Sequence, residues 1–266
     1  MSIRSVVVTG AGAGIGLAIA QRLDHDGYHV VGIERDAVPA AAAQSSFSSG
    51  GEVIAGDVTD RGVLARARAA AEAAGDLVGW VNNAGVALSG NLHSPVERDV
   101  EAVFAINLMG VYWGCAEAVQ SFIATGKAGS IVNISSIHGR AAFNGWAAYD
   151  TAKGGVDALT RYVSVEYGPL GIRANSVAPG AIRPDLVRRV IAEAEDPVRA
   201  EQEMSEIHPM ERLGEPTEIA AVVAFLLSDE ASFVSGESIA VDGGATARAF
   251  RYEPSSEIRG FARGMG

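Results

Sequence analysis

The sequence has a single cysteine, few aromatic residues and no long apolar run, and each shortage excludes a class of protein. Cys115 stands alone in 266 residues, so an intrachain disulfide is impossible and a reducing compartment is expected. Aromatic residues make up 6% of the chain while alanine, valine and glycine are frequent, which suits helices packed closely on a parallel sheet. The apolar run at 220–227 is far shorter than the roughly 20 residues of a membrane span.

Positive charge is scarce as well. Lysine and arginine number 21 against 32 acidic residues, giving a formal net charge of −11. Nucleic acids and anionic membranes attract clustered lysine and arginine, so neither is expected as a partner. The N-terminus enters a strand-like run at once, without the basic and apolar regions of a secretory signal. We therefore expect a soluble, cytoplasmic protein.

Strand-like and helix-like segments alternate along the chain without a linker. This alternation predicts one doubly wound, Rossmann-type α/β domain over 1–245, with about seven parallel strands and helices on both faces. A charged segment at about 183–213 is expected to form a mobile loop over the substrate, and 246–266 to form a polar C-terminal tail. Strands are expected at 5–9, 28–33, 53–58, 77–81, 130–134, 172–177 and 238–241, and helices at 17–25, 65–74, 99–125, 147–167 and 218–227.

A glycine-rich turn follows the first expected strand. Thr9 and Gly10 begin the pattern T-G-x3-G-x-G, which ends at Gly16. Between a buried strand and a helix, such glycines let the backbone approach a pyrophosphate and leave the phosphate charge at a helix N-terminus. A plain flexible loop is the alternative, but the position favours a phosphate site. The predicted cofactor-binding residues of this turn are Gly10, Ala13, Gly14, Ile15 and Gly16.

An acidic residue ends the second expected strand. Glu34 lies 18 residues after Gly16, where a carboxylate can hydrogen-bond the adenosine ribose hydroxyls and repel a 2′-phosphate. This position favours NAD over NADP. Arg35 follows directly and would suit a 2′-phosphate, so NADP is the alternative coenzyme, and a solvated turn is the plainest interpretation. Asp57, after the third strand, is expected near an adenine edge.

Residues suited to ligands stand at six strand ends, and in doubly wound sheets ligands bind beyond the carboxyl ends of the strands. They are Gly10, Glu34, Asp57, Asn82, Ser136 and Pro179.

Tyr149 and Lys153 are four residues apart in the expected helix 147–167, which places them one turn apart on one face. An ammonium near a phenol favours the phenolate, so the pKa of Tyr149 is predicted to fall from about 10 toward neutrality. A phenol with that pKa is a general base near pH 7. Ser136, at the end of a neighbouring strand, could hold the substrate oxygen. Because this spacing recurs by chance on many helices, the prediction depends on the coenzyme site.

These motifs together closely resemble the short-chain dehydrogenase/reductase family, in its single-domain form, over residues 3 to about 245. The resemblance rests on Thr9-Gly10-x3-Gly14-x-Gly16, Asn82-Asn83-Ala84-Gly85, Asn107, Ser136, Tyr149-x3-Lys153 and Pro179-Gly180. It implies that Tyr149 is the general acid/base and that Ser136 binds the reacting oxygen. Lys153 would lower the tyrosine pKa and hold the nicotinamide ribose, and Asn107 would anchor a water in a proton relay. Hydride would pass directly between the substrate carbon and the nicotinamide.

The resemblance also implies further contacts and an assembly. The family usually forms tetramers through its two long helices, here 99–125 and 147–167, so a homotetramer is expected. A threonine that often contacts the nicotinamide carboxamide is replaced by Arg183 and Pro184, which puts this contact in doubt. The implied additional cofactor contacts are Arg35, Asp57, Val58, Asn83, Ala84, Gly85, Tyr149, Lys153, Pro179, Gly180 and Ile182.

The substrate pocket is less readable. In 3-hydroxybutyrate dehydrogenases of this family a histidine at the place of His138 helps bind the substrate carboxylate, but their lysine before the tyrosine is here Trp146. That substrate is therefore not expected. His138 either lines the pocket or satisfies a loop carbonyl, and Trp146 and Phe143 indicate an apolar pocket wall or core packing. Asp150 is expected to point away from the active face. The five histidines are scattered, so no metal site is predicted.

Three functions fit the sequence. The first is an NAD-dependent oxidoreductase that acts on a secondary alcohol or its ketone. The second is an NADPH-dependent carbonyl or 3-oxoacyl reductase, against which Glu34 counts. The third is a dinucleotide-binding regulator without catalysis, which has no need for the set Asn107, Ser136, Tyr149 and Lys153.

Overall fold

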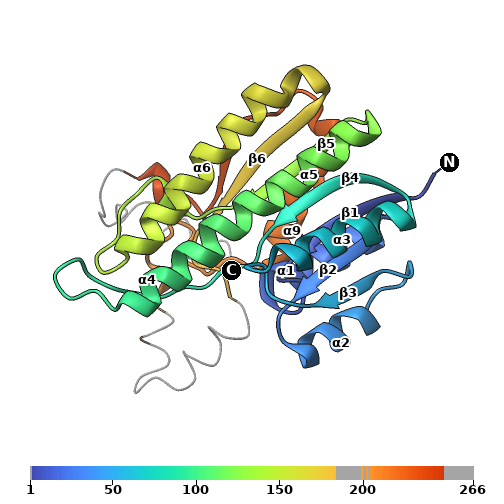
Figure 1. Ribbon diagram of the computed structural model, residues 1–266. Coiled ribbons are helices and arrows are strands. Elements are labelled where there is room, and N and C mark those ends of the chain that lie inside the picture. Colours follow the sequence, from blue (N-terminus) through green and yellow to red (C-terminus); the bar gives the residue numbers. More distant parts are fainter. Residues whose placement is uncertain (1, 184–198, 200–201, 203, 249–266) are drawn as a thin grey trace, which may run out of the picture.

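Seven parallel strands form one sheet in the computed structural model, which describes residues 2–183, 199, 202 and 204–248 (Figure 1). The strand order is β3-β2-β1-β4-β5-β6-β7, so it reverses between β1 and β4. At such a reversal the carboxyl ends of the strands form a ligand crevice. The predicted Rossmann-type sheet is confirmed. The strands are β1 Arg4–Thr9, β2 His29–Glu34, β3 Glu52–Ala55, β4 Asp76–Asn82, β5 Gly129–Ile134, β6 Ile172–Pro179 and β7 Ser238–Val241.

Helices cover both faces of the sheet (Figure 1). The helices α1 Gly14–His25 and α9 Pro216–Leu227 pack on one face, and α3 Arg61–Ala74, α5 Val111–Thr125 and α6 Ala147–Tyr167 pack on the other. Side chains of a strand alternate between faces. Val6 and Val8 of β1 accordingly lie in the core cluster with α1 and α9, while Val7 lies in the cluster with α3, α5 and α6.

The edge of the sheet near β3 differs from the expectation. The helix α2 Ala37–Ser45 lies between β2 and β3, where the sequence shows no apolar periodicity. The strand β3 ends at Ala55, so Asp57 and Val58 lie in the following turn instead of in the expected strand 53–58. There Asp57 Oδ1 accepts hydrogen bonds from the backbone N and the Oγ1 of Thr59, both at 2.8 Å. This local turn competes successfully with strand pairing.

The expected helix 99–125 is one helical run in three parts: α4 Glu97–Phe104, a π-helical turn Ala105–Gly110, and α5. The run Glu97–Thr125 is long and apolar enough, by composition, to cross a membrane. The residues Val103, Val111, Cys115 and Phe122, however, are buried, and the last three pack with the sheet. The run is therefore a core helix of the α/β domain.

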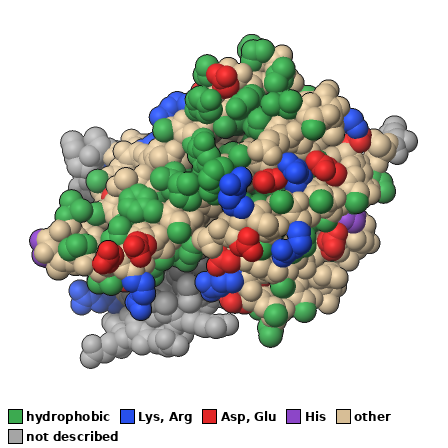
Figure 2. Space-filling view, viewed as in Figure 1, with side chains coloured by type: hydrophobic (Ala, Val, Ile, Leu, Met, Phe, Trp, Pro, Cys, Tyr) green, Lys and Arg blue, Asp and Glu red, His purple; other side chains and the backbone are tan. Residues whose placement is uncertain are grey.

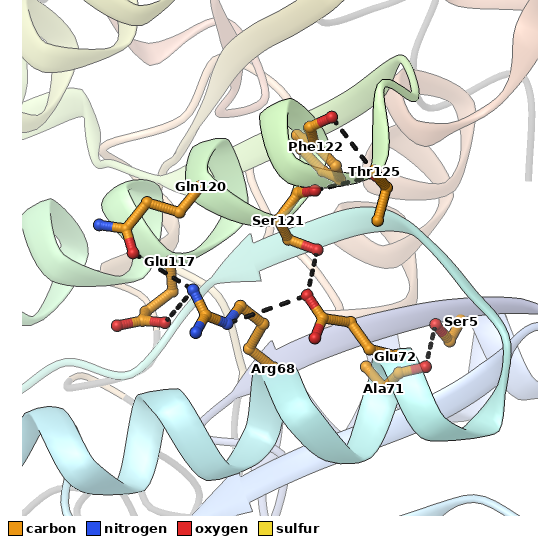
Figure 3. A network of polar contacts seen from close by, with 9 residues as sticks. All are labelled: Ser5, Arg68, Ala71, Glu72, Glu117, Gln120, Ser121, Phe122 and Thr125. Atoms are coloured by element: carbon orange, nitrogen blue, oxygen red, sulfur yellow. Dashed lines mark hydrogen bonds and ion pairs between the residues drawn. The ribbon is translucent and has the colours of Figure 1, made fainter.

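A polar network joins α3 to α5 on the surface of that layer (Figure 3). The Arg68 guanidinium pairs with Glu117 at 3.1 Å and donates a hydrogen bond to Gln120 at 3.2 Å. Glu72 accepts a hydrogen bond from Ser121 at 2.6 Å. Glu117 is 8% exposed, so its charge is almost removed from water and depends on Arg68.

Of the segment expected at 183–213, residues 184–198, 200–201 and 203 lie outside the described residues. Residues 204–213 are tied to the domain, because His208 and Leu213 are buried. Of the expected tail, 249–266 lies outside the described residues. The residues before it are anchored: Thr246 donates hydrogen bonds to Asp242, and Arg248 donates to the carbonyls of Glu206 and Ile207.

Candidate active site

The glycine turn is braced by the end of β4. The Asn83 amide Nδ2 donates to the carbonyls of Thr9 and Gly10 at 2.9 and 3.2 Å. Thr9 Oγ1 accepts from the backbone N of Asn83 and of Ala84 at 2.9 and 3.0 Å. At Gly16 a Cβ atom would lie 1.9 Å from the Gly10 carbonyl oxygen, so this position needs glycine. The side chain of Asn83, a residue predicted to line the cofactor groove, thus holds the glycine turn in place.

The start of α1 is open for a phosphate group. Ala13 is its N-cap residue and supplies no side-chain cap, so the first backbone N–H groups have no side chain bound to them. Ala13 is exposed, and Gly14 and Ile15 are partly exposed. An uncapped helix N-terminus behind a tight glycine turn fits a dinucleotide pyrophosphate. The predicted residues Gly10, Ala13, Gly14, Ile15 and Gly16 are therefore brought together.

Glu34 ends β2 and folds over the glycine turn. Its Oε2 accepts from the Gly12 backbone N at 3.0 Å, and its Oε1 accepts from the Asp36 backbone N at 3.2 Å. A Cβ at Gly12 would lie 2.5 Å from Glu34 Cγ, so Gly12 makes room for the carboxylate. This role of Gly12 was not predicted, although the residue lies inside the motif. Arg35 is exposed and pairs with Asp36 at 3.3 Å.

Ser136, Tyr149 and Lys153 meet beyond β5. Ser136 is buried and caps the short 3-10 turn Ile137–Gly139, where its Oγ accepts from the His138 backbone N at 3.2 Å and hydrogen-bonds Tyr149. Lys153 Nζ donates to the Ile134 carbonyl at 2.8 Å and lies 5.6 Å from the centroid of the Tyr149 ring. The helix α6 presents both residues on one face, as the spacing predicts.

The protonation of this group differs from the prediction. Burial raises the pKa of Tyr149 above its ordinary value; the Ser136 hydrogen bond lowers it, and the charge of Asp150 raises it further. Burial also lowers the pKa of Lys153 to about 8, against the opposing charge of Asp157. The expected lowering of the tyrosine pKa by Lys153 is therefore wrong. The physical reason is that the same burial that brings the pair together also disfavours both charged forms.

Asn107 lies in the π-helical turn and is completely buried. Its Oδ1 accepts from the Val86 backbone N at 2.8 Å, and its Nδ2 donates to the Val86 carbonyl at 2.8 Å. The side chain thus holds the loop that follows β4. Asn82, counted among the ligand-suited strand ends, is also structural: it is 2% exposed and hydrogen-bonds Trp80 and Asn133.

Asp150 turns toward the site, contrary to the prediction that it points away. Its Oδ1 contacts His138 Nδ1 at 2.5 Å, and its Oδ2 accepts from the Phe143 backbone N at 2.9 Å. The His138 ring stacks on Phe143 with centroids 4.0 Å apart, and it meets the rings of Trp146 and Tyr149 edge-on at 5.5 and 5.1 Å. His138 therefore binds a carboxylate inside an aromatic cluster, and its ring makes no hydrogen bond to a loop carbonyl of the described residues.

The end of β6 is held by a histidine that no sequence motif singles out. His208 is 2% exposed; its Nε2 accepts from the Ala181 backbone N at 3.1 Å, and its Nδ1 contacts the Asp242 carbonyl at 2.6 Å. A cavity of about 490 Å³ lies beside it. Among the predicted site residues Ile182 lines this cavity, while Ser136, Tyr149 and Lys153 do not.

The other predicted cofactor residues lie at the same carboxyl edge. Ala84 is partly exposed and Gly85 exposed, whereas Val58 is buried in the core below α3 and α5. Pro179 ends β6, and the Gly180 backbone N donates to the Val241 carbonyl at 3.1 Å. Pro184 lies outside the described residues, while the Arg183 backbone N donates to Gly214. Over the described part of the chain, no group of three or more metal-ligating side chains occurs.

Comparisons with known proteins agree with this geometry. A family model described as enoyl-(acyl carrier protein) reductase matches residues 10–246. The chain is 36% identical to 2-(S)-hydroxypropyl-CoM dehydrogenase 3 of Xanthobacter autotrophicus over 91% of this chain and 96% of that protein. It is 38% identical to levodione reductase of Leifsonia aquatica, over 92% and 94% of the two chains.

Among solved structures, a single-residue variant of actinorhodin polyketide ketoreductase with NADPH superposes with a TM-score of 0.86 at 27% identity, covering 92% of this chain and 98% of that one. The match to the family model, to both relatives and to the solved ketoreductase structure spans nearly the whole domain in each case. The chain belongs to the short-chain dehydrogenase/reductase family of nicotinamide-dependent oxidoreductases.

Proposed function

We propose that this oxidoreductase interconverts a secondary alcohol and its ketone with NAD, and that Tyr149 moves the proton. The observation that carries the proposal is the meeting of Ser136, Tyr149 and Lys153 at the same sheet edge as the glycine turn. The relatives named above are a dehydrogenase and a reductase, which suits both directions of this reaction.

Ser136, Tyr149 and Lys153 have different roles in the proposed reaction. Ser136 Oγ donates a hydrogen bond to the reacting oxygen and so polarises the substrate. In alcohol oxidation the Tyr149 phenolate accepts the hydroxyl proton as the carbon gives up its hydride; in ketone reduction the phenol returns that proton. The nicotinamide supplies the hydride acceptor or donor. Lys153, held by the Ile134 carbonyl, places its ammonium 5.6 Å from the centroid of the Tyr149 ring, where a positive charge favours the phenolate.

Glu34 supports NAD as the coenzyme. Its carboxylate lies against the phosphate turn, so the 2′-phosphate of NADP would meet a negative charge there. The Arg35 guanidinium is already paired with Asp36. The ketoreductase of similar fold is described with NADPH, so NADP is the competing coenzyme, and Glu34 distinguishes the two.

A coenzyme assay tests this proposal. Purified protein is incubated with a panel of secondary alcohols and either NAD or NADP, and absorbance of the reduced nicotinamide is followed. We expect kcat/KM to be at least about 100-fold higher with NAD, and Glu34→Ala to reduce this preference about tenfold or more because the repulsion is removed. Preference for NADP in the wild type would contradict the coenzyme assignment. Absence of turnover with either coenzyme would favour the non-catalytic alternative.

The homotetramer is also a proposal. Hydrophobic side chains gather over α5 and α6 on the face shown in Figure 2. Apolar surface of this kind on two neighbouring helices suits contact with another copy of the chain. The exposed members are Met109 in the π-helical turn, Tyr112 and Ile123 in α5, and Tyr162 and Val165 in α6.

A further inference from the structure

The pairing of Asp150 with His138 stands next to the proposed reacting groups. Asp150 follows Tyr149 directly in α6, and the His138 backbone N donates to Ser136 Oγ at 3.2 Å. Both side chains are mostly buried, with exposed fractions of 17% for Asp150 and 16% for His138. A carboxylate and an imidazole are therefore held within one residue of the base and two residues of the serine.

The hydrogen bonds leave one ring atom of His138 available. Nδ1 contacts Asp150 Oδ1 at 2.5 Å, and a carboxylate accepts hydrogen bonds, so Nδ1 carries the proton. In the neutral ring Nε2 is then a hydrogen-bond acceptor. Nε2 has no hydrogen-bond partner among the residues that the structure describes, and it is not fully buried.

Several contacts fix the orientation of the His138 ring. Phe143 stacks on it at 4.0 Å with an interplanar angle of 20°, while Trp146 meets it edge-on at 73°. The second oxygen of Asp150 is held by the Phe143 backbone N at 2.9 Å, so the carboxylate cannot rotate freely. An acceptor whose tautomer and orientation are both imposed is suited to selecting a ligand group.

We propose that Asp150 is a positioning residue that holds His138 Nε2 as the acceptor for a second hydroxyl group of the substrate. This inference rests on the proposed function and narrows its substrate class to diols and other polyols. The ring centroids of His138 and Tyr149 lie 5.1 Å apart, which suits a second hydroxyl on a carbon adjacent to the reacting one or on the next carbon. The carboxylate of Asp150 disfavours an anionic group in the same place.

Matched substrates test the inference. Butane-2,3-diol is compared with butan-2-ol, and pentane-2,4-diol with pentan-2-ol, each with NAD. The ratio of kcat/KM for a diol to that for its mono-alcohol measures recognition of the second hydroxyl and cancels the common chemistry. We expect the wild-type ratio to exceed about ten for one of these pairs, the size of one well-placed hydrogen bond.

Two variants separate recognition from folding. His138→Phe keeps an aromatic ring against Phe143 but removes Nε2, and it is expected to bring the ratio close to one, mainly through a higher KM for the diol. Asp150→Asn removes the carboxylate that imposes the tautomer and is expected to lower the ratio several-fold. Combining the two should lower it no further than His138→Phe alone, because both act through one atom. Thr151→Ala, which removes a hydroxyl bonded to the Ala147 carbonyl, is the control and should leave the ratio unchanged.

The outcomes are distinguishable. A wild-type ratio near one, or variants that lower turnover of diol and mono-alcohol equally, would overturn the inference and leave the proposed function intact, since the pair would then be purely structural. Absence of turnover with every alcohol would overturn both.

Discussion

For Tyr149, the sequence predicts the position of the side chain but not the direction in which its pKa is shifted. The helical spacing to Lys153 correctly predicts that the two side chains share a face of α6. The direction of the pKa shift could not be predicted, because it depends on burial, which raises the pKa of Tyr149 and lowers that of Lys153. Tyr149 is therefore a protonated phenol at neutral pH, the form that donates a proton in ketone reduction. Below about pH 8 Lys153 keeps its positive charge.

Asp24 gives the clearest dependence of stability on pH. Burial alone would raise the pKa of this carboxyl, but hydrogen bonds from the hydroxyl and backbone N–H groups of Ser48 and Ser49 outweigh it and lower the pKa from 3.8 to about 2. A folded-state pKa below the unfolded value stabilises the fold above about pH 4, and this contribution disappears as pH falls through 2. We expect Asp24 to contribute about 2 kcal/mol to the free energy of unfolding at pH 7.

Urea unfolding at several pH values checks this prediction. Asp24→Asn should be less stable than the wild type at pH 7, and the two should converge toward pH 2. A difference between the two proteins that stays constant from pH 7 to pH 2 would show that the carboxylate charge contributes nothing.

Other residue roles required the structure. Asp150 and His138 are twelve positions apart, and their contact depends on the path of the loop between β5 and α6. His208 lies in a segment with no motif, so nothing in the sequence connects it with Ala181 and Asp242. The role of Gly12 could in principle be predicted. Gly12 lies in the glycine turn that follows β1, and Glu34 ends the neighbouring strand β2.

At the scale of elements, the polar network that joins α3 to α5 can be tested directly. Arg68→Met removes the cation beside Glu117, whose carboxylate is nearly out of water. We expect a loss of about 2 kcal/mol in the free energy of unfolding, because an almost buried carboxylate is left without its partner. Chemical denaturation followed by circular dichroism measures it.

Arg22→Met is the matched control for that variant. Arg22 pairs with Asp26 at 2.8 Å, but both side chains are well exposed, so the same substitution should cost less than about 1 kcal/mol. Equal losses of unfolding free energy in the two variants would show that burial of Glu117 does not strengthen its pairing with Arg68.

Elements with a strong local signal were predictable, and those without one were not. The strand β1 is a run of buried valines before a glycine turn, and its position was predicted closely. The helix α2 is alanine-rich and lacks an apolar face, so periodicity could not reveal it. The helix α9 starts at Pro216, earlier than expected, because Glu215 and Glu218 form a capping box. The π-helical turn around Asn107 has no recognisable sequence pattern.

At the scale of the molecule, the parallel sheet follows from a simple rule. Parallel strands need crossover connections, which the helices between the strands supply. Alternation of strands and helices was therefore sufficient to predict the fold and the edge at which the site lies. Contacts between copies of the chain depend on surface shape, which the alternation does not contain.

The proposed tetramer leads to a prediction about mass. Val165 is 79% exposed and Tyr162 is 56% exposed on α6. Replacing both, as Tyr162→Arg with Val165→Glu, should dissociate the assembly, because charges would be buried in an apolar contact. Light scattering after size exclusion should show four times the chain mass of 27.4 kDa for the wild type and a smaller species for the variant.

Val38→Glu is the control for the assembly, since Val38 is also highly exposed but lies on α2, away from α5 and α6. It should keep the wild-type mass. A wild-type protein that is monomeric, or a double variant that keeps the full mass, would contradict the proposed interface.

The most direct test of the central claim is the activity of Tyr149→Phe. This variant keeps the ring and its contacts with His138 and Trp146 but removes the one hydroxyl that is proposed to carry the proton. We measure kcat for alcohol oxidation with NAD together with the Kd for NADH, read from its fluorescence. We expect kcat to fall at least about 100-fold while the Kd changes less than about threefold. A variant that keeps nearly the wild-type kcat would show that another group transfers the proton.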